Sequence, residues 1–143
     1  MPYATQSDLV DRFGQAELAQ LTDLVNGTTI NTVVLGRALA DADAEVDTRV
    51  GSRYALPLAS VPPVLVRVAA DIARYFLWAD AASEQVRNRY KDAIGLLDKI
   101  ASGHVVLPAA TTLSPGGQAV TTVSRASEPQ FSASALDAFG PPV

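Results

Sequence analysis

The sequence predicts an all-α protein: a small helical bundle of three long helices, with short N-terminal helices before it and an extended C-terminal arm after it. Apolar residues recur at steps of three and four through most of residues 1–103, which is the spacing of a buried helical stripe. Capping residues, prolines and glycines divide this region into separate helices. With 143 residues, 48% of them hydrophobic, the chain can bury one core as a single ordinary domain.

Two short helices are expected first, one beginning at Ser7 and ending at Gly14, the other spanning residues 15–21. Ser7 is a good N-cap, because its hydroxyl can accept a hydrogen bond from an unpaired amide of the first turn. Gly14 can end the first helix in a left-handed conformation. The loop that follows is expected to turn at Asn26-Gly27.

The first long helix is expected to begin after Asn31 or Thr32 and to end near Gly51. Acidic side chains occupy the rest of its circumference, and Glu45 is expected to pair with Arg49 one turn on. Its buried stripe consists of Leu35, Ala38, Leu39, Ala42, Val46 and Val50.

The second long helix is expected to begin at Pro62 and Pro63 and to run to about Ala82, since a proline in the first turn removes no intrahelical hydrogen bond. Asp71 is expected to pair with Arg67 and Arg74 on the side opposite the apolar face. That face consists of Leu65, Val68, Ala69, Ile72, Tyr75, Phe76 and Ala79.

The third long helix is expected to start after the N-cap Ser83 and to close at Gly103. So little chain separates it from the second long helix that the two should form a tight antiparallel hairpin. Its buried stripe consists of Val86, Tyr90, Ile94, Leu97 and Ala101.

Composition divides the chain into a helical body, residues 1–103, and an extended tail or arm, residues 104–143, which is rich in Pro, Gly, Ser, Thr and Ala. Strand-like clusters of valine and threonine occur only at residues 104–107 and 119–124. The tail nevertheless carries three large apolar side chains, Phe131, Leu136 and Phe139. Such side chains are typical of an arm that docks onto a neighbouring subunit, or equally of one that docks back onto its own body.

Trp78, late in the second long helix, is a further candidate interface residue. Aromatic side chains are enriched at contacts between subunits, whereas packing in the core is the commoner role for a tryptophan at such a position.

No catalytic, cofactor-binding or metal site is expected. The chain has no cysteine and a single histidine, His104, so it cannot build a thiolate site or a histidine cage. The acids that begin at Asp41 resemble the start of a calcium loop, but Val46 and Ser52 stand where that loop needs Gly and Glu. An enzyme is therefore not expected.

A membrane protein or a nucleic-acid wrapper is not expected either. The most apolar stretch, residues 61–79, is interrupted by three charges, and the N-terminus lacks the pattern of a signal peptide. The formal net charge of −4 disfavours binding through phosphate neutralisation. A small helical DNA-binding or regulatory protein is the alternative; its best support, Arg87, Arg89 and Lys91, is spread around the helix.

Several segments together resemble the Mu-like phage and prophage head–tail connector family, over residues 3–103. They are Tyr3-Ala4-Thr5, Asp8-Leu9-Val10, Arg12-Phe13-Gly14, Glu17-Leu18, Leu21-Thr22-Asp23, Ala38-Leu39-Ala40-Asp41-Ala42-Asp43-Ala44-Glu45-Val46-Asp47, Arg53-Tyr54-Ala55-Leu56-Pro57-Leu58, Val61-Pro62-Pro63, Asp71-Ile72-Ala73-Arg74-Tyr75, Arg89-Tyr90 and Asp92-Ala93.

The resemblance implies a structural virion protein without catalytic residues or cofactor. It implies a head–tail adaptor in the neck of the virion, assembled in the cytoplasm of the bacterial host. Such subunits form a ring, commonly twelve-fold, that touches the portal protein on one side and a stopper or tail-completion protein on the other. DNA passes through the lumen without specific binding. An acidic subunit suits such a conduit, because it repels DNA where a basic one would hold it.

Overall fold

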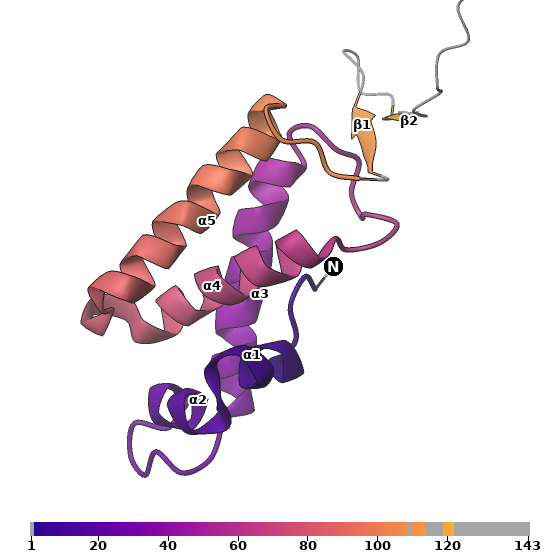
Figure 1. The fold of residues 1–143 in the computed structure, drawn as a ribbon. Helices are drawn as coiled ribbons and strands as arrows, with labels where there is room; N and C mark the ends of the chain where they lie inside the picture. The colour runs from indigo at the N-terminus through magenta and orange to yellow at the C-terminus, as the bar shows by residue number, and fades with distance from the viewer. Residues whose placement is uncertain (1, 109, 114–118, 122–143) are drawn as a thin grey trace, which may run out of the picture.

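The computed structural model describes residues 2–108, 110–113 and 119–121. It contains five α-helices and one short hairpin, which confirms the predicted all-α class (Figure 1). The helices are α1 (Gln6–Phe13), α2 (Gln15–Thr22), α3 (Thr32–Val50), α4 (Pro63–Trp78) and α5 (Glu84–Ser102), with a 3-10 turn, Ala79–Ala81, after α4. Strands β1 (Thr111–Leu113) and β2 (Ala119–Thr121) pair antiparallel, Thr112 opposite Val120.

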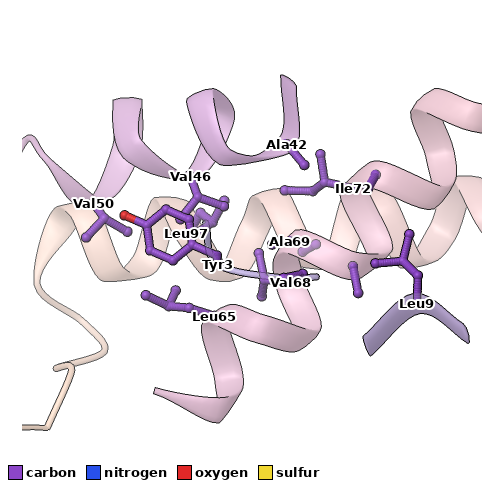
Figure 2. Close-up of a cluster of buried hydrophobic side chains, with 14 of the residues drawn as sticks. Tyr3, Leu9, Ala42, Val46, Val50, Leu65, Val68, Ala69, Ile72 and Leu97 are labelled. Atoms are coloured by element: carbon purple, nitrogen blue, oxygen red, sulfur yellow. The ribbon is translucent and has the colours of Figure 1, made fainter. Parts of the chain in front are cut away.

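The core lies where α3, α4 and α5 pack together, as the apolar periodicity predicts. Ala42, Val46 and Val50 of α3 face Leu65, Val68, Ala69 and Ile72 of α4, with Leu97 of α5 closing the cluster (Figure 2). The predicted stripe of α3 is largely confirmed, because all its members except Leu39 are buried. Small alanines at Ala38 and Ala42 let the α4 backbone approach closely.

The N-terminal cap differs from the expectation. Thr5, not Ser7, caps α1: its hydroxyl accepts from the amide of Asp8, whose carboxylate in turn accepts from the Thr5 amide. This reciprocal pair satisfies two amide groups at once and therefore outcompetes the single bond available to Ser7. Gly14 does adopt a positive φ of 90°, but with an extended ψ of 149°, so it joins α1 directly to α2.

Tyr3 ties the N-terminal segment to α3. Its side chain is almost fully buried, its amide donates to Asp43 over 3.0 Å, and its hydroxyl donates to Asp47. Asp43 and Asp47 belong to the acidic side chains predicted for the exposed circumference of α3, and they serve here as hydrogen-bond acceptors for Tyr3. Burial and the hydrogen bond to Asp47 raise the pKa of the Tyr3 phenol well above its ordinary value.

Helix α4 ends earlier than predicted, at Trp78 rather than near Ala82. Ala79 has a positive φ of 49°, which a helix cannot continue, and the 3-10 turn follows. Both ends of α5 are as predicted: Ser83 caps it through the Val86 amide, and Gly103 ends it in the left-handed conformation at φ 87°.

The buried stripe of α5 is only partly as predicted. Val86 and Leu97 are buried, but the other three predicted members are half-buried, and Ala93 and Ile100 are buried in their place.

The predicted ion pairs of Asp71 are wrong. Asp71 is buried at 8% exposure, and its ion-pair partner is Arg89 of α5, 3.8 Å away. Arg74 instead binds Glu17 of α2 through two bonds of 2.7 and 3.1 Å. Tertiary neighbours prevail because pairs along one helix are worth only about 0.2–0.5 kcal/mol. The predicted pair of Glu45 with Arg49 is confirmed.

The chain continues along the body beyond α5. Leu107 is buried at 2% exposure, and its amide donates to the buried hydroxyl of Tyr54 over 3.0 Å. Residues 104–107 form no strand, contrary to the valine content, whereas β2 falls within the predicted stretch 119–124. The division between body and tail after residue 103 stays a prediction.

Candidate functional site

Of the four candidate interface residues, only Trp78 belongs to the described part of the chain. It lies at the C-terminal end of α4 and is partly buried, and its indole Nε1 is shielded from solvent with no hydrogen-bond acceptor among the described residues. Its role as an interface residue stays a prediction. Phe131, Leu136 and Phe139 lie outside the described residues.

Large exposed apolar side chains gather at the end of the molecule where α3 begins. Leu24 and Val25, in the loop between α2 and α3, are each 90% exposed, and Val33 in the first turn of α3 is 62% exposed. We call these three residues the apolar end. Exposing them to water is unfavourable, since burial of each such side chain is worth about 1.5–3 kcal/mol. Clustered exposure of this kind marks a contact surface.

A groove of about 290 Å³ opens beside the apolar end. Three elements form its walls: α2 with the loop after it, the first turns of α3, and the last turn of α4. It is lined by Leu21, Leu24, Val34, Arg37, Ala38, Asp41, Phe76 and Leu77. Arg37 is exposed at this groove and makes no ion pair with any described residue. The groove is therefore mainly apolar, with one cation, Arg37, and one acid, Asp41, among its lining residues.

A second pocket, of about 420 Å³, lies between α1, α4 and α5. It is lined by Arg12, Phe13, Arg67, Asp71, Arg89 and Asp92. Burial raises the pKa of the Asp71 carboxyl, against the opposing effect of Arg89 and Arg67. Arg74 lies next to this pocket with its guanidinium 4.5 Å from the centre of the Phe13 ring. Three arginines therefore face two aspartates in this pocket, and the ion pair between described residues there joins Arg89 to Asp71.

The basic cluster considered for DNA binding does not form one surface. All three side chains are exposed, but they point in different directions around α5, and the Arg89 guanidinium lies 3.8 Å from the Asp71 carboxylate. Nonspecific duplex binding draws instead on a basic stripe that tracks several phosphates.

Within the described part of the chain, no group of three or more His, Asp or Glu side chains could hold a metal ion. None of the helices there is both long and apolar enough to cross a membrane.

Sequence reasoning missed both the apolar end and the burial of Asp71. Leu24 and Val25 stand in a segment with clear turn residues, and their apolarity in such a loop was the available signal. Asp71 follows three apolar or small residues and precedes two more, so its position within the longest apolar run was a signal for burial.

The fold defines a small all-α protein with exposed apolar side chains and an open groove at one end. Comparison with known proteins assigns it more closely: the model of the family "Bacteriophage Mu, Gp36" matches residues 3–124. The chain belongs to this family of Mu-like phage proteins, which confirms the coarser part of the predicted resemblance.

Two relatives show the extent of the similarity. The Mu-like prophage FluMu protein gp36 of Haemophilus influenzae is 39% identical over 105 residues, covering 73% of this chain and 74% of that protein. Gene product J of Escherichia phage Mu is 32% identical over 136 residues, covering 92% of this chain and 95% of that protein. The second match extends into the tail as well as the body.

Proposed function

We propose that this phage protein is a head–tail adaptor of the virion neck. In this role copies of the chain form a ring, twelve-fold in our proposal, between the portal protein and a stopper or tail-completion protein. The subunit has no catalytic activity and needs no cofactor. It is assembled in the cytoplasm of the bacterial host and then remains in the virion.

The observation that carries the proposal is the apolar end beside an open groove. In a subunit that acted alone, Leu24, Val25 and Val33 would stay exposed to water, and no contact would offset the unfavourable free energy of that exposure. A subunit of a closed assembly covers such a surface with its neighbour, and contacts between unlike surfaces close into a ring. Membership of a Mu-like phage family agrees with a virion component.

The charge of the chain supports passage of DNA through the ring without specific binding. The formal net charge is −4, and two of the arginines close to Asp71, Arg74 and Arg89, are paired with acids of the same chain. An inner wall of this character repels the phosphate backbone. A structure of the ring whose lumen is lined mainly by arginine would contradict this part of the proposal.

In vitro complementation tests the adaptor role directly. A phage with this gene disrupted is expected to produce DNA-filled heads and complete tails that do not join. Addition of the purified protein should restore joined, infective particles, and its mass should rise to that of a ring when purified portal protein is present. Normal joined particles from the disrupted phage would overturn the proposal.

The alternative, a small DNA-binding or regulatory protein, makes an opposite prediction. It requires affinity for duplex DNA that falls steeply as salt rises. We expect no such binding from the purified chain at physiological ionic strength. Salt-dependent binding together with unimpaired head–tail joining in the disrupted phage would favour the alternative.

A further inference from the structure

We propose that the groove between α2, α3 and α4 is the docking site for residues 131–139 of a second copy of this chain. The inference rests on the proposed function, because it supplies the contact by which one subunit holds the next. The groove residues are all described in the structure, and the occupant is identified by its sequence.

The chemistry of the groove and of the occupant match. The groove offers Leu21, Val34 and Leu77 as apolar walls, with Arg37 exposed at its side. The occupant, Phe131-Ser-Ala-Ser-Ala-Leu136-Asp137-Ala-Phe139, has three large apolar side chains separated by small ones. Small residues between anchors let a backbone lie close to a surface while the anchors enter it.

Charge complementarity supports this choice of occupant. Asp137 stands directly after Leu136, so a segment that buries Leu136 brings its carboxylate to the side of the groove. Arg37 makes no ion pair with the described residues and is available to meet it. Asp41 also lines the groove one turn after Arg37 and would repel a carboxylate, so the proposal places Asp137 on the side of Arg37 that faces away from Asp41.

The direction of the chain favours a second copy over the chain's own groove. Helix α3 runs from the apolar end toward the end where β1 and β2 lie (Figure 1). With 19 residues it spans about 28 Å at 1.5 Å per residue. Residue 121 lies at that far end, and residue 131 of the same chain could reach its own groove only if the residues between were almost fully extended, since ten residues span at most about 33–36 Å.

In the described part of the chain, no row of exposed apolar side chains runs along the body, so a tail that followed the body to its own groove would find few apolar contacts on the way. In the described part of the chain, the large hydrophobics that are exposed lie at the two ends: the apolar end at one, and Leu56 and Val106 at the other. Ordering an extended segment costs about 1–2 kcal/mol per residue, which the surface between the two ends does little to offset. In the proposed head-to-tail arrangement, the end of one copy that carries β1 and β2 would face the groove of the next copy, and no return along the body would be needed.

Cysteine cross-linking tests the proposal, since the natural chain contains no cysteine. Two full-length variants, Val34→Cys in the groove and Leu136→Cys in the tail, are mixed under mild oxidation, alone and with portal protein. We expect a disulfide-linked heterodimer at a yield at least about tenfold above that of a control mixture, because docking raises the local thiol concentration to the millimolar range. The control pairs Leu136→Cys with Arg87→Cys, an exposed site on α5.

A double variant carrying both Val34→Cys and Leu136→Cys distinguishes the two docking modes. An intrachain disulfide in dilute double variant, with no heterodimer from the mixture, would show docking onto the same body and overturn the proposal. Yields equal to the Arg87→Cys control would overturn it as well. As a second measurement, Arg37→Glu should weaken the association of copies of this chain with one another at least about tenfold. Adding Asp137→Arg to the same chain should restore that association.

These outcomes are separable from the fate of the proposed function. If natural protein joins heads to tails but the cross-link is absent, the adaptor role stands and this contact is wrong. If the cross-link forms but heads and tails join without the protein, the chain assembles with itself for another purpose.

Discussion

Replacing Tyr54 by phenylalanine tests how the body holds the segment that leads to the tail. Tyr54 is 1% exposed and follows α3, and its hydroxyl accepts the hydrogen bond of the Leu107 amide over 3.0 Å. Phenylalanine keeps the ring and therefore the packing, but it removes the only described acceptor of that amide. The change isolates one hydrogen bond between residues 53 positions apart.

The size of the effect follows from the burial of both partners. An amide left buried and unpaired costs about 1–3 kcal/mol, and Leu107 at 2% exposure has little access to water. We therefore expect the free energy of unfolding to fall by about 1–3 kcal/mol. For a domain of this size the corresponding loss in Tm is roughly 3–10 °C.

Urea unfolding followed by fluorescence measures this loss, with Trp78 as the single tryptophan. Tyr75→Phe is the matched control, because its ring stacks on Tyr90 at 4.0 Å and its hydroxyl makes no hydrogen bond to a described residue. The control should change stability by less than about 0.5 kcal/mol. Hydrogen exchange should also speed up at the Leu107 amide in Tyr54→Phe. Equal stability of the two variants, with unchanged exchange, would refute the reasoning.

Three other perturbations have defined signs. The raised pKa of the buried Tyr3 phenol means that its stabilising effect is complete below pH 10.0 and is lost as pH rises above it, so Tyr3→Phe should flatten the decline in Tm measured from pH 9 to 11. Because the pKa of Asp71 is raised in the folded state, its contribution to stability is fully present below pH 3.8 and is lost as pH rises and the buried carboxyl ionises. Asp71→Asn should therefore become more stable relative to the natural chain as pH rises from 4 to 7, measured by urea unfolding. Gly103→Ala should lower the free energy of unfolding by about 1–2 kcal/mol, because φ is +87° and the new Cβ would lie 2.7 Å from the Arg53 guanidinium. Gly95→Ala, in open helical space, should raise it by about 0.5–1 kcal/mol. Thermal melts should show shifts in Tm of opposite sign for the two variants.

Local signals in the sequence predicted most of the fold. Asn31, Ser83 and Gly103 each act through backbone groups within four residues, so their roles could be predicted without knowing the tertiary structure. The apolar stripe of α3 was equally accessible, because its period depends only on helical geometry. The cap at Thr5 was missed because two residues in one turn compete for that role, and the capping box decides between them.

The contacts that define the candidate site depend on elements far apart in the chain. Glu17 and Arg74 are 57 positions apart, and nothing local indicates that their side chains meet. The groove has the same character, since its walls come from α2, α3 and α4, and its existence follows from how these helices pack. An amphipathic pattern predicts which face of a helix is buried but not which neighbouring surfaces stay uncovered.

The polar contacts around α4 link the packing of the body to the shape of the groove. Glu17 on α2 holds Arg74 on α4 through two hydrogen bonds, with both side chains more than three-quarters buried. Leu21 of α2 and Leu77 of α4, which line the groove, lie one turn beyond these two residues on their helices. A bidentate ion pair thus links two of the groove walls, and its geometry is more directional than apolar packing. In the ring that we propose, such a link would limit the error in each contact between neighbours, because those errors would accumulate around the ring.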